Sequence, residues 1–394
     1  MGTNRLILLG EMMPLKVAII HYWLVGMRGG EKVVEALCEM YPGADIYTHV
    51  YVPEMVSETI RKHRVVPTFI NRLPRARHLY KAYLPLMPMA LEQLDLRAYD
   101  LIISSESGPA KGVMAAPGAL HVCYCHTPMR YIWNMFHDYR QSAGLLTRLA
   151  MPPLAHYLRL WDVSSAVRVD SFVANSATVA ARIRRYYGND ATIIHPPVDT
   201  KAFSPVPYSE VADYYLMAGE LVSYKRPDLA VRAFNELKLN LVVIGGGEML
   251  AEVRRLAGPT VSVLGPQPFA ILKHRYARCR ALIFPGEEDF GMVPVEAMAS
   301  GRPVVAFGRG GATETIARDL TGVFFDEQTV DAIADAVSRL SAMEFDSDAI
   351  TAHAEHFNQE QFVRKMRAHI DTLLSQRDPQ NLRYQSSFRQ WAAT

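Results

Sequence analysis

The chain has 394 residues, of which 49% are hydrophobic and 21% charged, a composition typical of a folded protein with two or three domains. This composition excludes a disordered chain, and no run of eighteen apolar residues is present that would predict a membrane-spanning helix. The 42 lysines and arginines against 40 acidic residues give a net charge of +2, which offers no support for a nucleic-acid partner.

The four cysteines, Cys38, Cys123, Cys125 and Cys279, match no metal or redox spacing. We therefore expect buried thiols in the reducing environment of a cytoplasm. No cluster of histidine, aspartate and cysteine has the spacing of metal ligands, so no metal site is expected.

The first half of the chain alternates short apolar runs with helical patterns. A glycine turn at Gly29 and Gly30 predicts a helix that continues to about Cys38. The strands expected here are residues 16–21, 100–104, 121–125, 171–174 and 191–195. This alternation is typical of βαβ units, which form a parallel sheet covered by helices on both faces.

Prolines 196, 197, 205 and 207 interrupt this pattern, and a second series of alternating elements follows. Its expected helices are 227–237 and 358–376, and its expected strands are 214–218, 241–244, 261–264, 281–285, 303–307 and 322–325. We predict an α/β protein with two doubly wound, Rossmann-like domains, 1–205 and 206–365, followed by a C-terminal helix and polar tail, 366–394. The cleft between two such domains is the expected place for a ligand.

Three glycine-rich turns, 26–30, 245–247 and 308–311, stand between expected strands and helices. Glycine lets a backbone approach a phosphate, which the amides at the start of the following helix can bind. Any turn of this kind favours glycine, so a purely structural role stays open. None of the turns fits the dinucleotide-binding fingerprint, which disfavours a dehydrogenase.

The most specific segment contains two glutamates, Glu288 and Glu296, on either side of an expected helix start. The amides of Phe290, Gly291 and Met292 lie between them. Carboxylates accept hydrogen bonds from sugar hydroxyls and helix-start amides bind diphosphates, so this arrangement suits a sugar nucleotide. The plain alternative is a surface loop followed by an acid favoured by the helix dipole.

Segment 285–301 resembles the hallmark of family 4 retaining glycosyltransferases of the GT-B fold. Segments 16–31, 126–133, 224–228 and 310–314 also resemble members of this family, in particular bacterial polysaccharide and lipopolysaccharide mannosyltransferases. The resemblance implies that two Rossmann-like domains face each other across a cleft. The first would bind the acceptor and the second the sugar nucleotide, and the last helix would cross back to the first domain.

The resemblance also implies roles for the residues on the donor side. Glu296 would hold the ribose hydroxyls, and Glu288 would contact the donor sugar together with the amides of residues 290–292. Lys225 would neutralise the diphosphate leaving group.

In the first domain, Gly29 and Gly30 would let the glycine-rich turn 26–30 approach the diphosphate or the acceptor. His126 would lie beside the donor sugar, and Arg130 would help to bind phosphate or acceptor.

One position departs from the family pattern. Many relatives have an arginine a few residues before the lysine, where this chain has Glu220. A carboxylate beside a diphosphate is repulsive by about 1–4 kcal/mol at a partly buried site. Either Arg226 substitutes for the missing arginine, or Glu220 points away and pairs with a cation. A non-catalytic binding or scaffold subunit is a third alternative.

The resemblance thus implies a retaining, metal-independent glycosyltransferase without a cofactor. Segments 126–133 and 224–228 favour transfer of mannose from GDP-mannose to a lipid-linked oligosaccharide or other saccharide acceptor in polysaccharide or lipopolysaccharide synthesis. UDP-glucose and UDP-galactose stay open as donors.

Residues 59–91 contain no acidic residue, whereas basic residues there alternate with aromatic and aliphatic ones. We expect Arg72, Arg75, Arg77 and Lys81 to face the acceptor or an anionic membrane, where each charge contributes about 1 kcal/mol. This predicts a cytoplasmic protein bound peripherally to the inner leaflet of the membrane. A solvated helical face is the alternative.

Overall fold

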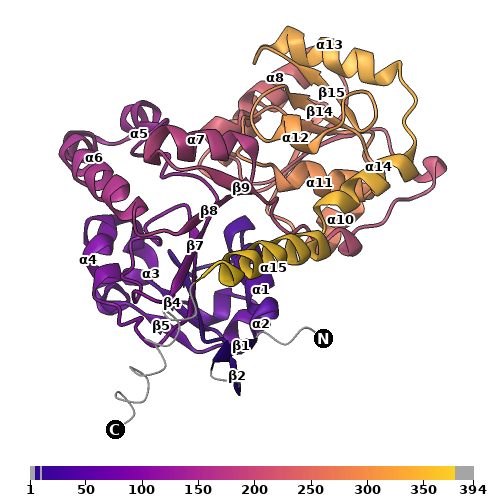
Figure 1. Cartoon of the computed structure of the whole chain (residues 1–394). Coiled ribbons are helices and arrows are strands. Elements are labelled where there is room, and N and C mark those ends of the chain that lie inside the picture. The colour runs from indigo at the N-terminus through magenta and orange to yellow at the C-terminus, as the bar shows by residue number, and fades with distance from the viewer. Residues whose placement is uncertain (1–4, 9–10, 378–394) are drawn as a thin grey trace. The chain divides into compact units, whose positions relative to one another are not determined.

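The computed structural model describes residues 5–8 and 11–377, and its contacts divide the chain into two compact units (Figure 1). Unit 1 extends to Ile194 and resumes at Val363, and unit 2 comprises His195–Phe362. The contacts therefore change just before the prolines of residues 196–207, whereas the sequence places the boundary at 205. The expected tail after Asp378 lies outside the described residues.

Unit 1 is built on a seven-stranded parallel sheet with the order β5-β4-β3-β6-β7-β8-β9. Its strands are β3 (Val17–His21), β4 (Asp45–Thr48), β5 (Val65–Pro67), β6 (Leu101–Glu106), β7 (Leu120–Cys125), β8 (Ser171–Ala174) and β9 (Ala191–Ile193). The central strands β6 and β7 are buried along their whole length because this sheet is covered on both faces. β4 and β5 lie outside the expected strands, since one is a short run with polar ends and the other is an edge strand that ends in proline.

The helices of unit 1 pack around this sheet. They are α1 (Gly29–Met40), α2 (Glu58–Arg61), α3 (Ala76–Leu79), α4 (Met87–Glu92), α5 (Phe136–Ser142), α6 (Leu145–Ala166) and α7 (Ala177–Tyr187), with the 3-10 helices η1 (Pro53–Met55), η2 (Phe69–Arg72) and η3 (Tyr80–Leu86). A separate hairpin pairs β1 (Arg5–Leu8) with β2 (Glu11–Pro14).

The last helix, α15 (Gln359–Ser375), belongs to unit 1 from Val363 onward, as predicted. His369 Nε2 lies 2.9 Å from Ser171 Oγ at the start of β8, and Arg377 donates to Asp170 Oδ2 at 2.7 Å. The buried side chains of Met366 and Ile370 add apolar contacts.

Unit 2 is a second doubly wound domain. It is built on a six-stranded parallel sheet with the strand order β12-β11-β10-β13-β14-β15. Its strands are β10 (Tyr215–Ala218), β11 (Leu241–Ile244), β12 (Val261–Gly265), β13 (Leu282–Phe284), β14 (Val304–Phe307) and β15 (Gly322–Phe325). Its helices are α8 (Pro227–Leu237), α9 (Leu250–Leu256), α10 (Phe269–Arg278), α11 (Met292–Ala299), α12 (Ala312–Thr315), α13 (Val330–Ser341) and α14 (Ser347–Ala354), with the 3-10 helices η4 (Thr200–Ala202), η5 (Tyr208–Glu210), η6 (Ser223–Lys225) and η7 (Glu355–Phe357).

Alternate residues of the unit 2 strands enter two separate apolar clusters. Leu216 and Val304 belong to one cluster, and their neighbours Tyr215 and Val305 belong to the other. This is the period of two that a sheet buried on both faces requires. The predicted α/β class with two doubly wound domains is confirmed.

All four cysteines are buried and unpaired, as expected. Among residues 5–8 and 11–377, no helix combines the length and the apolar character needed to cross a bilayer.

Candidate functional site

The strand order of unit 2 reverses between β10 and β13, and ligands of open α/β sheets bind at the carboxyl ends of strands beside such a reversal. The loop after β10 carries Lys225 and the loop after β13 carries Glu288. Lys225 Nζ lies 2.9 Å from Glu288 Oε1, with only 15% and 17% of the two side chains exposed. Glu288 Oε1 is buried against Lys225, so the pair is shielded from water.

The charge on Lys225 is set by opposing effects. Burial lowers the pKa of Lys225, but the carboxylate of Glu288, followed by Tyr224 and Glu220, outweighs burial and leaves the pKa raised. Lys225 is therefore a cation at neutral pH. Glu220 is exposed, yet its charge reaches Lys225.

Arg226, the expected substitute for the missing arginine, is bound by a carboxylate of its own helix. Its Nε and a terminal nitrogen each donate to Asp228 at 3.1 Å. Arg226 also adopts the left-handed conformation, with φ of 52°, just before the proline that opens α8. Its role in binding phosphate stays a prediction.

Glycines hold the loops of this site against one another. A Cβ on Gly286 would lie 2.5 Å from Lys225 Cα, and one on Gly311 would lie 2.3 Å from Phe290 Cα. The Gly311 amide donates to the Glu288 carbonyl at 2.8 Å. Gly245 has φ of +148° and packs directly against the carbonyl of Gly219. The glycine turns 245–247 and 308–311 therefore have a packing role, and contact with a phosphate stays a prediction.

Glu296 lies one turn inside α11, as expected, and is oriented by a buried tyrosine. Its Oε2 accepts a hydrogen bond of 2.9 Å from Tyr276, whose pKa is raised by burial and by the Glu296 charge. The hydroxyl of Tyr276 therefore remains a donor. Gly291, with φ of +85°, precedes the first residue of α11, and Phe290 is buried beside it.

In unit 1, a chain of polar side chains begins at His126, the residue after β7. His126 Nε2 lies 2.8 Å from Ser105 Oγ, which lies 3.1 Å from His21 Nδ1. His21 Nε2 is 3.8 Å from Glu31 in the first turn of α1. Burial raises the pKa of Glu31, but its contacts with His21 outweigh burial and leave the pKa lowered. Glu31 therefore supplies a negative charge at the end of this series of polar side chains that lies opposite His126.

His21, Ser105 and Glu31 were not predicted as site residues. The signal that could have found His21 and Ser105 is their place near the carboxyl ends of β3 and β6, where the strand order of unit 1 reverses.

Gly29 and Gly30 form the start of α1, as predicted. A Cβ on Gly30 would lie 2.5 Å from the Tyr22 hydroxyl, so this glycine is needed for packing, whereas Gly29 is exposed. The Arg28 amide donates to Glu31 Oε2 at 3.0 Å and caps the helix.

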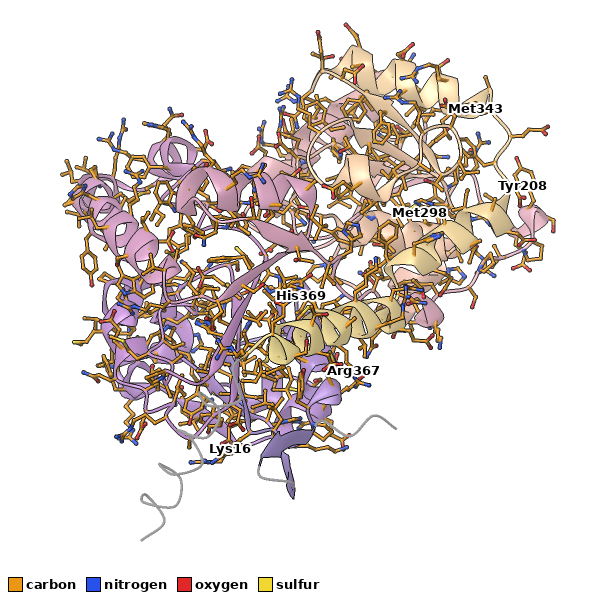
Figure 2. All side chains as sticks on the ribbon, in the orientation of Figure 1. Lys16, Tyr208, Met298, Met343, Arg367 and His369 are labelled. Carbon is orange, nitrogen blue, oxygen red and sulfur yellow. The ribbon has the colours of Figure 1, made fainter. Side chains whose placement is uncertain are left out.

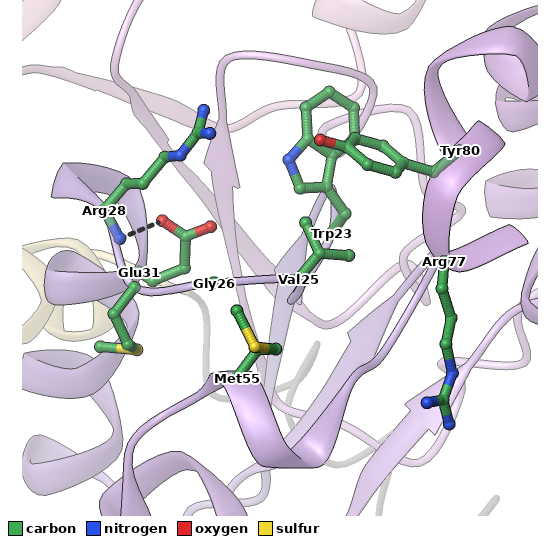
Figure 3. A pocket seen from close by; sticks show the side chains of 9 residues that line it. Trp23, Val25, Gly26, Arg28, Glu31, Met55, Arg77 and Tyr80 are labelled. Carbon is green, nitrogen blue, oxygen red and sulfur yellow. Dashed lines mark hydrogen bonds between the residues drawn. The ribbon is translucent and has the colours of Figure 1, made fainter. Parts of the chain in front are cut away.

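A pocket of about 350 Å³ lies beside this loop (Figure 3). The rings of Trp23 and Tyr80 stand 4.8 Å apart on one side of it, and Arg28 and Glu31 lie on another. Arg77 also lines the pocket and pairs with Glu54 at 2.9 Å. Aromatic faces beside guanidinium groups can hold a sugar ring and an anionic group.

The other predicted cations lie elsewhere in unit 1. Arg72, Arg75 and Lys81 are exposed on η2, at the start of α3 and on η3, and they do not line this pocket. Arg130 is half-buried in the turn after His126, with its guanidinium 3.8 Å from Met135 Sδ.

A fully buried charge cluster lies behind the 126–133 segment and was not predicted. Lys111 pairs with Glu106 at 2.7 Å and with Asp162 of α6. Asp162 Oδ2 also accepts hydrogen bonds from Trp133 Nε1 at 2.8 Å and from Tyr187 at 2.9 Å. The cluster thereby ties the segment that starts at His126 to α6.

The residues predicted to hold a nucleotide, Lys225, Glu288 and Glu296, lie on the loops and helix that follow β10 and β13 of unit 2. Among residues 5–8 and 11–377, no three histidine, cysteine, aspartate or glutamate side chains come together as metal ligands.

Two family models match the chain in succession. Residues 27–202 match the model "Glycosyltransferase Family 4", and residues 201–358 match "Glycosyl transferases group 1". The two matches coincide with the bodies of unit 1 and unit 2.

Curated relatives match about half of the chain. A GDP-mannose-dependent alpha-(1-6)-phosphatidylinositol monomannoside mannosyltransferase of Mycobacterium tuberculosis is 29% identical over 221 residues, which are 48% of this chain and 57% of that protein. A D-inositol 3-phosphate glycosyltransferase of Kribbella flavida is 28% identical over 227 residues, 48% of this chain and 54% of that protein. The chain thus spans about half the length of these relatives.

Solved structures match the whole fold. The lipopolysaccharide outer core galactosyltransferase WaaB in its apo form has a TM-score of 0.63 at 16% identity, covering 91% of this chain and 99% of that one. Anabaena Alr3699/HepE in complex with UDP and glucose has a TM-score of 0.68 at 16% identity, with the same coverage. At this identity the likeness shows the fold, which is GT-B.

Proposed function

We propose that this chain, which belongs to the family 4 glycosyltransferases, transfers a sugar from a nucleoside diphosphate to a hydroxyl group of an acceptor. The observation that carries the proposal is the buried Lys225–Glu288 pair at the strand reversal of unit 2. It combines a cation suited to a diphosphate with a carboxylate suited to sugar hydroxyls.

In the proposed reaction, the bond between the anomeric carbon and the diphosphate oxygen breaks, and the acceptor oxygen bonds to the same face of that carbon. The acceptor proton passes to the leaving phosphate oxygen, and attack from the face that the diphosphate leaves retains the configuration. Lys225 stabilises the charge that develops on the diphosphate, which is the dominant kind of catalytic contribution. Glu288, with the amides of residues 290–292, holds the sugar, and Glu296 holds the ribose. His126 positions the sugar, oriented by Ser105 and His21.

GDP-mannose is the donor that we propose. It is supported by the 126–133 and 224–228 segments and by the name of the mycobacterial relative. UDP-glucose is the alternative donor, since the Anabaena structure holds UDP and glucose.

The acceptor that we propose is a lipid-linked saccharide of polysaccharide or lipopolysaccharide synthesis at the inner leaflet of the membrane. The unit 1 pocket supports this class, because Trp23 and Tyr80 offer ring faces to a sugar while Arg28 and Arg77 suit a phosphate. The name of the mycobacterial relative, which acts on a phosphatidylinositol mannoside, points the same way.

Nucleotide binding is the first test. At about 100 times its dissociation constant, a ligand adds ~2.7 kcal/mol of stability, which raises the unfolding midpoint by a few degrees. We expect GDP or UDP to produce this shift, and Glu296→Ala to lose it because the ribose contact is removed. Thermal unfolding with GDP, UDP, ADP and the matching sugar nucleotides measures it.

Glu236→Ala is the matched control, since Glu236 is an exposed carboxylate of α8 in the same unit and should keep the shift. Absence of a shift with every nucleotide would contradict the transferase proposal. A scaffold subunit would then be favoured, with Glu220 as the charge that weakens the diphosphate site.

We further propose that the transfer needs no metal ion, because Lys225 and the backbone amides supply the positive charge that the diphosphate requires. Turnover after dialysis against a chelator is expected to equal turnover with added Mg²⁺ within a factor of about two. A loss of activity that Mg²⁺ restores would overturn this proposal.

A further inference from the structure

Helix α6 of unit 1 presents an apolar face to solvent. The side chains of this face form two groups, one before and one after the prolines at 152 and 153, and both groups fall on the same side of the helix. They are 41–84% exposed: Leu145, Leu146, Leu149, Tyr157, Leu160, Val163 and, directly after the helix, Val167. The opposite face is buried through Ala155, Leu158 and Trp161. An apolar surface of this extent marks an interaction site.

Charge distinguishes the two sides of α6. Its single acidic residue, Asp162, is fully buried against Lys111, so the exposed face carries no carboxylate. Arg148 is exposed near the first turn of the helix. A helix with one apolar face and basic residues beside it is the type that lies in a membrane interface.

The neighbouring elements extend this surface. α4 is joined to α6 through Glu92, which pairs with Arg168 at 2.8 Å and accepts a hydrogen bond of 3.1 Å from Trp161. Leu86 and Met89 are exposed on η3 and α4, and the exposed cations of residues 72–81 precede them along the chain. Figure 1 shows α3, α4 and α6 along the same side of unit 1, and Figure 2 shows the side chains that project from this side.

We propose that the exposed face of α6 docks unit 1 on a bilayer with anionic lipid headgroups, with the helix lying in the plane of the interface. The face is roughly 33 Å long at 1.5 Å per residue, and its leucines would enter the boundary between headgroups and acyl chains. Arg72, Arg75 and Lys81, which do not line the pocket, would contact the headgroups.

A lipid surface fits this face better than a second copy of the chain. In a two-fold dimer the same patch meets itself, and because the exposed face of α6 carries no carboxylate, this face of a second copy offers no negative charge to the basic margin formed by residues 72–81. Anionic headgroups neutralise that margin instead. The proposal does not rest on transferase activity, because vesicle binding is measured without turnover.

The test is co-sedimentation of the full chain with vesicles of phosphatidylcholine, alone or mixed with phosphatidylglycerol. We expect the protein to bind the mixed vesicles, less so at high salt. The triple variant Leu146→Gln, Leu149→Gln and Leu160→Gln should bind them more weakly by a factor on the order of ten or more. The matched control replaces exposed apolar residues elsewhere, Ile193→Gln, Ile271→Gln and Leu320→Gln, and should bind like the wild type.

Both triple variants should keep the wild-type unfolding midpoint, since polar substitutions at exposed positions cost little stability. The proposal is overturned if the wild type does not bind mixed vesicles, or if the α6 variant binds them as well as the control does. A wild-type dimer in analytical ultracentrifugation that the α6 variant converts to monomer, without a change in vesicle binding, would assign the face to self-association.

Discussion

Asp162→Ala is expected to lower the unfolding midpoint of the protein by roughly 10 °C. The variant leaves the buried Lys111 ammonium with Glu106 as its one remaining carboxylate partner, and it removes the acceptor used by Trp133 and Tyr187. The lost ion pair and the two buried donors left without their acceptor together cost about 3–5 kcal/mol, since each unsatisfied buried donor alone costs about 1–3 kcal/mol. Each kcal/mol lowers the midpoint by about 2–4 °C in a domain of this size. Differential scanning calorimetry measures the shift.

Two further variants identify the cause. Asp162→Asn keeps an oxygen for Trp133 and Tyr187 but loses the charge, so its midpoint should fall between those of the wild type and Asp162→Ala. Asp95→Ala removes the exposed carboxylate that pairs with Arg97 at 2.7 Å, and it should leave the midpoint nearly unchanged. A similar loss in Asp95→Ala and Asp162→Ala would contradict the assignment of stability to burial.

The regular elements of both sheets could be predicted because parallel strands buried on two faces form continuous apolar runs. The expected strands 171–174, 241–244 and 322–325 have the observed bounds, as does helix 227–237. β4 and β5 could not be predicted in this way. Asp45 and Thr48 interrupt the apolar pattern of the first, and only three residues form the second.

In the candidate site, too, individual residues could be predicted from the sequence, whereas the contacts between them could not. Lys225 and Glu288 were each predicted from a resemblance, but their ion pair follows from the order of β10 and β13, which local patterns do not encode. Glu106 and Lys111 lie only five residues apart, but Asp162 lies 51 residues after Lys111, and nothing local marks any of them as buried. In α6, Leu158 and Leu160 are both apolar, yet one is buried and the other is 61% exposed. The sequence pattern alone does not predict which apolar face of a helix packs against the rest of the protein and which stays exposed.

Lys225→Met is expected to lower kcat by about 10²–10³-fold, because it removes a preorganised cation from the position where the leaving diphosphate gains charge. The pKa of Lys225 is raised in spite of burial, so the wild-type side chain carries its full charge at neutral pH. The KM for the sugar nucleotide should change much less than kcat, since the ribose contact through Glu296 is kept. Release of nucleoside diphosphate from the sugar nucleotide measures both constants.

The control for this variant is a second ion pair of the same unit. Lys201 pairs with Glu360 across 2.5 Å, but both side chains are more than 70% exposed, so Lys201→Met should keep the wild-type kcat. Because Lys225→Met strands the buried Glu288 carboxylate, its stability must be separated from its chemistry. The double variant Lys225→Met/Glu288→Gln removes that charge and should regain stability while activity stays low. If Lys225→Met retains kcat within about threefold of the wild type, the Lys225 cation does not act on the leaving group, and other groups such as Arg226 or the backbone amides of the glycine turns must stabilise the diphosphate.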